Sequence, residues 1–122
     1  MRLSKEEVLK YQQNKPPYLM IDEAEEVIPG KSAKGYKYLD PSEWFFKVHW
    51  PTDPNMPGML QIESLVQMCA LSLLTLPGNK GKLVYIISAN NLVFKRKSSL
   101  NLQGTFFIFI HIIIYVYYVE RK

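Results

Sequence analysis

The stretch FFKVHWPTDPNMPGMLQIESLVQ, residues 45–67, decides the fold of this chain. It leads into an apolar run, MLQIESLVQMCALSLLTL at residues 59–76. Pro57 lies near the start of that run, where proline fits a first helical turn, and Pro77-Gly78-Asn79 ends it. Because apolar residues occur almost all the way round a helical projection, we predict a buried helix over residues 59–76.

Residues 40–58, ahead of this helix, have the composition of a long loop. They contain three prolines after Pro41 as well as His49, Trp50 and Asp53. Loops of this length in compact domains are usually functional or disordered, and the aromatic content argues against disorder. We therefore predict a functional loop here.

The N-terminal part of the chain predicts a helix and a hairpin. Ser4 and Glu7 have the spacing of a capping box, which predicts a helix over about residues 4–12. Residues 18–28 are predicted to form a strand with an irregularity around Glu23 to Glu26. Pro29-Gly30 is a turn, and residues 31–39 alternate as the return strand.

The C-terminal part predicts two more strands, at residues 83–95 and 105–119. The second, TFFIFIHIIIYVYYV, is too short for a membrane-spanning helix, which needs roughly 20 apolar residues. Its β-branched and aromatic residues favour a buried strand, in which His111 is expected to be a packed or edge residue. The whole order predicts an α+β fold, an antiparallel sheet with one central helix.

Composition excludes several classes of protein. The 122 residues suit a single domain over residues 1–122, and 48% apolar with 21% charged residues is typical of a soluble globular protein. The net charge of +4 comes with scattered lysines, which argues against nucleic-acid binding and suits an acidic protein partner. Cys69 is the single cysteine, expected to be buried and inert. With no apolar signal core at the N-terminus, we expect a cytoplasmic protein.

Glu63 is a carboxylate on an otherwise apolar helix, and burying it is costly unless it is used or satisfied. A carboxyl group in such a place is a candidate general acid. Gln67 lies four residues on, on the same helix face, and is expected to hydrogen-bond to Glu63. The alternative is a structural carboxylate tied to a backbone amide or a lysine.

His49 and the helix start are the other candidates. Histidine is the side chain best suited to proton transfer near neutral pH, although a packed histidine bound to backbone is the alternative. Gly58, in Met56-Pro57-Gly58-Met59, lets a ligand approach free N–H groups at the helix start, which can hold a thioester carbonyl. An ordinary helix start is the alternative there.

Taken together, these residues resemble a known family. His49, Met56-Pro57-Gly58 and Glu63 keep the spacing of the 3-hydroxyacyl-acyl carrier protein dehydratases of fatty acid synthesis. Residues 17–22 (PYLMID) resemble the opening strand of that family, residues 29–31 its hairpin turn, and residues 91–97 (NLVFKRK) the strand after its central helix. The resemblance covers residues 14 to 97.

The resemblance implies a hot-dog fold, a curved antiparallel sheet wrapped around one long central helix. Family members are homodimers, often assembled into trimers of dimers, with active sites at the dimer interface. His49 of one subunit would face Glu63 of the other. Histidine would take the C2 proton of a 3-hydroxyacyl thioester, and Glu63 would protonate or position the departing 3-hydroxyl. Gly58, Met59 and Gln67 would contact the substrate.

The resemblance also implies a partner. The substrate would be an acyl chain linked through phosphopantetheine to acyl carrier protein. The phosphopantetheine arm would enter the active site past the basic residues Lys95, Arg96 and Lys97. The acyl chain would lie along the helix. No metal or organic cofactor is implied.

Two features depart from the family. Val48 stands where the family has glycine before the histidine, in a position where glycine permits a conformation that valine disfavours. Residues 98–104 (SSLNLQG) replace a short Pro-Gly-Asp turn, and the family fold implies at least one strand more than the sequence up to Lys122 provides. The apolar run at residues 105–119 would then border an exposed sheet edge and favour aggregation.

Three functions remain as alternatives. The first is the dehydratase. The second is an acyl thioesterase on the same fold, because a fold alone does not set the reaction type. The third is a non-catalytic acyl-binding subunit, which Val48 and the atypical C-terminal part would favour.

Overall fold

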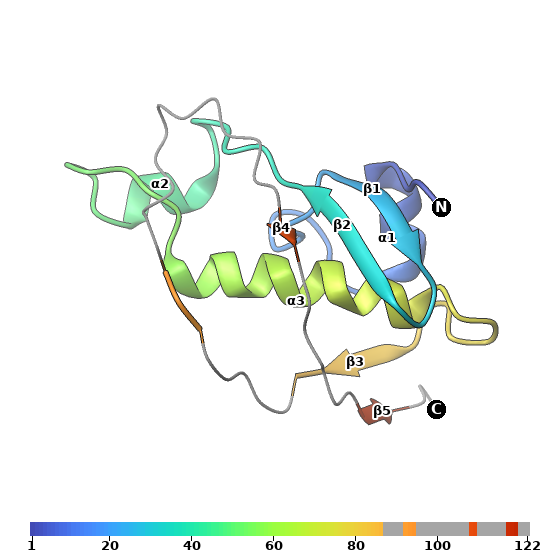
Figure 1. Cartoon of the computed structure of the whole chain (residues 1–122). Helices are drawn as coiled ribbons and strands as arrows, with labels where there is room; N and C mark the ends of the chain where they lie inside the picture. The colour runs from blue at the N-terminus through green and yellow to red at the C-terminus, as the bar shows by residue number, and fades with distance from the viewer. Residues whose placement is uncertain (87–91, 95–107, 110–116, 120–122) are drawn as a thin grey trace.

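The computed structural model shows an α+β fold in which one long helix packs with antiparallel strands, grouped in a three-stranded and a two-stranded sheet (Figure 1). The structure describes residues 1–86, 92–94, 108–109 and 117–119. Its elements, in chain order, are α1 (Lys5–Tyr11), β1 (Glu23–Ile28), β2 (Ser32–Tyr36), α2 (Trp44–Val48), α3 (Gly58–Leu74), β3 (Leu83–Tyr85), β4 (Ile108–Phe109) and β5 (Tyr117–Val119).

The N-terminal helix α1 begins with the predicted capping box. The Glu7 N–H donates to the Ser4 hydroxyl at 3.3 Å, and the Ser4 N–H donates to the Glu7 carboxylate at 2.8 Å. These bonds satisfy two of the donors that a helix start leaves open. Val8 turns inward and is fully buried, which packs α1 against the core.

Strands β1 and β2 form the predicted hairpin. Their register shifts between Ala24 and Glu26, so the irregularity predicted in this strand is confirmed as a bulge. Gly30 in the turn has a φ of +74°, a conformation that favours glycine. Its N–H donates to the Ser72 carbonyl oxygen at 2.6 Å, which ties the hairpin turn to the C-terminal part of α3.

The first predicted strand begins only at Glu23, so its first residues were assigned wrongly. Residues 19–21 are all buried, without the alternation of a half-buried strand. The Met20 N–H donates to the Gln67 side-chain oxygen at 2.7 Å, and the Met20 carbonyl accepts from the Ser64 hydroxyl at 2.6 Å. Side chains of α3 therefore replace the neighbouring strand that this segment lacks.

The long helix α3 confirms the predicted buried helix to within two residues at each end. It passes across the β1–β2 hairpin with β3 on its other side (Figure 1). Pro57 is its N-cap residue rather than part of its first turn. The buried positions are Ile62, Ser64, Gln67, Met68, Ala70, Leu71, Ser72 and Leu74.

The predicted loop over residues 40–58 contains a short helix, α2, which the sequence analysis missed. Asp40 starts the approach to it with a local turn, because its carboxylate accepts from both the N–H and the hydroxyl of Ser42. Phe45 and Phe46 anchor α2 by burial. A helix of five residues is too short to show an apolar period, which is why the sequence pattern did not reveal it.

Two groups of buried side chains form the core. The larger lies between α1, the hairpin and α3 and contains Leu3, Val8, Leu19, Ile21, Ala24, Val27, Ala33, Met68 and Leu71. The smaller surrounds α2 and contains Met20, Leu39, Phe45, Phe46 and Met56. Since residues 19–21 contribute to both, this segment joins the part of the fold that carries α3 to the part that carries α2.

The two predicted C-terminal strands are seen in part. Strand β3 pairs with β5, and β2 pairs with β4, both antiparallel. Ile86 and residues 92–94 are not in a strand, and residues 87–91 and 95 of the predicted strand 83–95 lie outside the described residues. Strands β4 and β5 both fall within the single strand predicted at 105–119, and His111 between them lies outside the described residues.

Gly35 provides a test of how closely β1 and α3 pack around β2. A Cβ at this position would collide with the Glu23 carbonyl oxygen on β1, and it would lie 2.8 Å from the Ala24 Cα and 2.6 Å from the Met68 methyl carbon on α3. We therefore expect Gly35→Ala to lower the free energy of unfolding by about 1–3 kcal/mol through overpacking. Urea denaturation measures the change, with Ser32→Ala on the same strand as the control. Equal stability of the two variants would contradict this close packing.

Candidate active site

His49 stands at the end of α2, where it is the C-cap residue. Its backbone N–H donates to the Phe45 carbonyl oxygen at 2.9 Å. Phe45 is fully buried, so the histidine backbone is fixed by a residue anchored in the core. The side chain itself is half-buried, which leaves it open to a ligand.

The imidazole of His49 is oriented by Asn55. The His49 Nδ1 atom lies 3.1 Å from the Asn55 carbonyl oxygen. A carbonyl oxygen only accepts, so in this hydrogen bond Nδ1 carries the proton and Nε2 keeps its lone pair. This is the tautomer that a general base needs. Asn55 is buried and donates to the Asp53 carbonyl at 2.7 Å, which holds the accepting segment in place.

The backbone near His49 is unusual at one residue, Trp50. Trp50 has a φ of +51°, whereas Val48 is the last residue of α2 and has no positive φ. Val48 therefore fits a helical backbone at the position where the dehydratase family that this sequence resembles has glycine. The Trp50 ring stacks on the imidazole, with centroids 5.1 Å apart and planes 15° from parallel. A bulky residue in the left-handed region of φ is strained, and at Trp50 this conformation holds the indole ring against the His49 imidazole.

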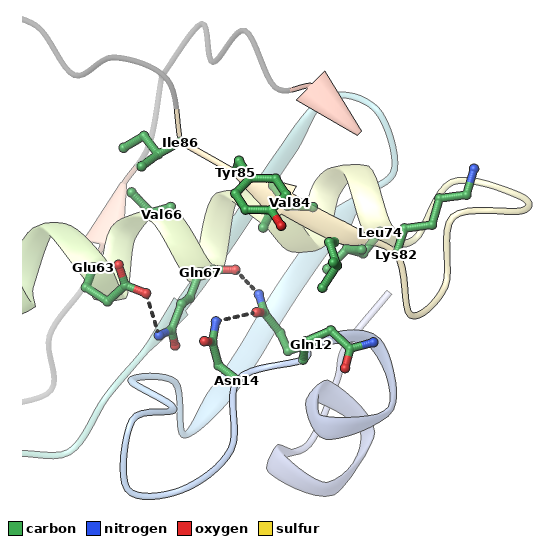
Figure 2. A pocket seen from close by; sticks show the side chains of 13 residues that line it. Gln12, Asn14, Glu63, Val66, Gln67, Leu74, Lys82, Val84, Tyr85 and Ile86 are labelled. Atoms are coloured by element: carbon green, nitrogen blue, oxygen red, sulfur yellow. Dashed lines mark hydrogen bonds between the residues drawn. The ribbon is translucent and has the colours of Figure 1, made fainter. Parts of the chain in front are cut away.

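Glu63 and Gln67 lie side by side on α3, one turn apart (Figure 2). The Gln67 Nε2 atom donates to the Glu63 carboxylate at 3.0 Å, which confirms the predicted hydrogen bond. The same nitrogen donates to the Tyr18 carbonyl at 3.0 Å, and the Gln67 Oε1 atom accepts from the Met20 N–H. Since both ends of this buried amide bind protein groups, the structure gives Gln67 the role of orienting Glu63.

Tyr18 is a member of the site that the sequence analysis placed only in a strand. Partial burial, followed by the Glu63 carboxylate, raises the pKa of the Tyr18 phenol, although the residue is 46% exposed. A phenol is protonated at neutral pH even at its ordinary pKa, so Tyr18 can donate a hydrogen bond. The sequence offers no signal for this role, because the proximity arises only when residues 18–20 pack on α3.

A cavity of about 320 Å³ lies beside Glu63 (Figure 2). Helix α3 contributes one apolar wall and the β3 region another, whereas residues 12–14 contribute amide side chains. In Figure 2 the Gln12 amide donates to the Gln67 carbonyl and accepts from Asn14. The lining residues are Gln12, Gln13, Asn14, Glu63, Val66, Gln67, Ala70, Leu74, Lys82, Leu83, Val84, Tyr85 and Ile86. The cavity thus combines an acidic group with apolar walls.

The start of α3 has no side-chain capping bond from its N-cap residue. Pro57 makes no side-chain cap, and its carbonyl accepts from the N–H groups of Leu60 and Gln61 at 3.0 Å. The N–H groups of Gly58 and Met59 belong to the first turn, where helical geometry provides no intrahelical acceptor. A Cβ at Gly58 would lie 2.9 Å from the Phe94 ring, so a larger residue there would have to displace this side chain, which is 54% exposed.

The structure brings the predicted site residues together in two groups. Glu63 and Gln67 share the cavity, and His49 lies on the loop before the helix, outside the described lining of that cavity. Lys95, Arg96 and Lys97 lie outside the described residues. Cys69 is half-buried rather than buried as predicted, and this partial burial raises the pKa of its thiol, which suits an unreactive cysteine.

In the described chain, the His, Cys, Asp and Glu side chains form no group of three or more that is placed to hold a metal ion. Its helices include none with the length and hydropathy of a membrane span.

Residues 13–99 match the family model described as the FabA-like domain. This chain belongs to the FabA-like domain family. Its α+β architecture, with an antiparallel sheet and the long helix Gly58–Leu74, is therefore a hot-dog fold, as the resemblance implied. His49, Gly58 and Glu63 all lie within the matched residues of this FabA-like domain.

Curated relatives of this FabA-like domain carry the name 3-hydroxyacyl-[acyl-carrier-protein] dehydratase FabZ. The protein of Clostridium novyi (strain NT) is 42% identical over 97 residues, which are 80% of this chain and 68% of the relative. That of Natranaerobius thermophilus is 44% identical over 81 residues, 66% of this chain and 57% of the relative. That of Clostridium botulinum (strain Hall) is 40% identical over 91 residues, 75% of this chain and 63% of the relative. The chain thus spans between 57% and 68% of the length of these relatives.

The hydrogen bonds of Gln67 predict a large effect of its removal on stability. Gln67→Met leaves the Tyr18 carbonyl and the Met20 N–H without partners, and a buried unpaired group costs about 1–3 kcal/mol. We expect the free energy of unfolding to fall by about 2–4 kcal/mol for the two groups together. Denaturant unfolding measures it.

Gln61→Met is the matched control for this prediction. Gln61 lies on the same helix and makes one part-buried bond, to the Met56 carbonyl at 3.0 Å. The assigned role of Gln67 is wrong if the two variants lose the same stability.

Proposed function

We propose that this FabA-like domain dehydrates 3-hydroxyacyl thioesters carried on acyl carrier protein, giving trans-2-enoyl thioesters. The observation that carries the proposal is the His49 imidazole, whose Nδ1 atom binds the Asn55 carbonyl and leaves Nε2 as a base. A second support is the Glu63 carboxyl group, held by Gln67 beside a cavity with apolar walls. The curated relatives, which carry the name of this activity at 40–44% identity, support the same assignment.

The proposed reaction uses one base and one acid. The Nε2 atom of His49 takes the C2 proton, and the C2 electron pair forms the new double bond to C3. The C3–O bond breaks as the Glu63 carboxyl group gives its proton to the leaving hydroxyl, which departs as water. The proton on His49 then returns to the Glu63 carboxylate through solvent, so the enzyme ends in its starting state.

The start of α3 has a distinct role in this scheme. Removal of the C2 proton shifts negative charge onto the thioester oxygen, which an N–H group at a helix start stabilises. Gly58 is the residue we assign to this role, with Met59 beside it as a further substrate contact. Met59 is 73% exposed, which fits a side chain that meets a ligand or a second subunit.

A homodimer would complete the site. His49 and Glu63 stand on different parts of one chain, and each has exposed apolar residues near it. Val48 and Trp50 adjoin His49 in the sequence, and Tyr85 and Ile86 line the cavity beside Glu63. A large exposed apolar surface usually marks an interface. We propose that a second copy covers it, with two-fold symmetry that places His49 of one subunit opposite Glu63 of the other.

Acyl carrier protein is the proposed carrier of the substrate. The chain has a formal net charge of +4, which complements an acidic partner. Lys95, Arg96 and Lys97 remain the predicted contact for it. We place this activity in the cytoplasm, since a chain with a single cysteine fits a reducing compartment.

Replacing the acid or the base tests both the chemistry and the shared site. We expect His49→Ala and Glu63→Gln each to abolish dehydration of a 3-hydroxyacyl thioester, measured by enoyl absorbance, while circular dichroism shows an intact fold. Co-expression of the two inactive variants should restore roughly a quarter of the wild-type rate. Half of randomly paired dimers would be mixed, and each mixed dimer would have one intact site of two.

The outcomes separate the alternatives. Full activity in both single variants would contradict the proposed pair, and no recovery on co-expression would place both residues of a site on one chain. Release of free thiol from an acyl thioester would instead support a thioesterase. Thermal stabilisation by an acyl thioester without any product would support a non-catalytic acyl-binding subunit.

A further inference from the structure

Lys37 is a buried lysine between two carboxylates. Its side chain is only 3% exposed, and its Nζ atom donates to the Glu43 carboxylate at 2.7 Å. The Asp22 carboxylate lies 3.9 Å from the same nitrogen. Asp22 also accepts from the Tyr38 N–H at 2.6 Å, so it is fixed to the backbone just after β2. The lysine therefore connects the end of the hairpin to Glu43.

Stability alone does not explain the ion pair of the buried Lys37. Taking charges out of water is costly, and a well-packed apolar pair in place of a buried ion pair is often equally stable or more so. What the ion pair adds is direction, because the ammonium group must meet its carboxylates at short range. The arrangement thus specifies where Glu43 lies relative to β2.

Glu43 is the N-cap residue of α2, yet its side chain makes no capping bond to that helix. Its carboxylate is bound to Lys37 instead. A five-residue helix is not stable by itself, so its position depends on tertiary contacts. Phe45 and Phe46 anchor the middle of α2 in the core. Apolar contacts of this kind constrain rotation and sliding of the helix only loosely. The bond to Lys37 fixes the end that those contacts leave free.

The opposite end of the same helix carries His49. Six residues separate Glu43 from His49, about 9 Å along a helix axis. A tilt at the Glu43 end therefore moves the imidazole relative to Asn55, whose carbonyl lies 3.1 Å from Nδ1. Loss of that bond would release the tautomer that leaves Nε2 free.

We propose that Lys37 is a positioning residue for the base: by binding Glu43 at the start of α2, it sets the place and the tautomer of His49 at the end of that helix. The role in catalysis depends on the proposed dehydratase function, whereas the effect on the tautomer does not. The substitution that tests it is Lys37→Met, which keeps the length of the side chain and removes its charge.

The first measurement is the tautomer of His49 in the full-length chain. Long-range proton–nitrogen spectra of protein labelled with ¹⁵N-histidine distinguish a proton on Nδ1 from one on Nε2. The sequence contains two histidines, and His49→Ala assigns the signals. With the ring neutral, we expect a single Nδ1-protonated form in the wild type and a mixture of both tautomers in Lys37→Met.

Lys5→Met is the matched control. Lys5 pairs with the same carboxylate group, at 3.3 Å from Asp22, but its side chain is 41% exposed, and this contact does not involve α2. This variant should keep the wild-type tautomer, and Lys37→Arg should restore it. A single Nδ1-protonated form in folded Lys37→Met would overturn the proposal.

A second variant covers the case in which Lys37→Met does not fold. Glu43→Ala removes the partner on α2 but leaves Lys37 close to Asp22, and the Glu43 side chain is 23% exposed, so its truncation is tolerable. We expect mixed tautomers in this variant too. An unchanged tautomer in Glu43→Ala would overturn the proposal independently of Lys37.

Turnover separates this proposal from the proposed function. In an active wild type, Lys37→Met should lower kcat by about 10- to 100-fold with little change in KM, because a small displacement of a catalytic group costs rate rather than binding. A wild-type kcat in that variant would overturn the positioning role. An inactive wild type would count against the dehydratase function, and the tautomer measurement would still decide the role of Lys37.

Discussion

The side-chain amide of Gln67 is the interaction on which the arrangement of the described chain depends. It is 2% exposed and binds Tyr18, Met20 and Glu63, while its own backbone carbonyl accepts from Gln12. The segment at residues 18–20 crosses the helix without a neighbouring strand, so its backbone polar groups need partners from α3. Without this amide, burial of that segment would leave unpaired groups, and the two parts of the core would lose the residues that join them.

This arrangement explains why a buried helix contains polar residues. Ser64 and Gln67 bind the Met20 backbone, and the Ser72 carbonyl accepts from the hairpin turn at Gly30. In the described residues, every buried side-chain nitrogen and oxygen has a hydrogen-bond partner. A satisfied polar group disfavours every other register, because a shift would leave it unpaired. Apolar packing thus drives the helix against the hairpin, and the polar residues select one position for it.

The sequence could predict the elements whose determinants are local. The capping box of Ser4 and Glu7, the turn at Gly30 and the apolar run of α3 each depend on neighbours in the chain, and the Glu63–Gln67 bond follows from helical spacing alone. The roles of Asn55 and Tyr18 could not be predicted. Both depend on contacts between segments that meet only in the folded chain. Helix α2 was missed because tertiary burial, rather than an apolar period, stabilises it.

The same division separates the two groups of the proposed acid–base pair. Glu63 stands on a long helix and is oriented by an uncharged amide from the same face, so helical spacing already brings the two together. His49 stands at the end of a helix too short to fix its own position, and the contacts that hold it come from elsewhere: the Asn55 carbonyl and the ion pair of Glu43 with Lys37. A base on so short an element needs more external anchors than an acid on a long one. The buried lysine and its carboxylate partner Glu43 therefore anchor α2, whereas α3 is held by uncharged groups.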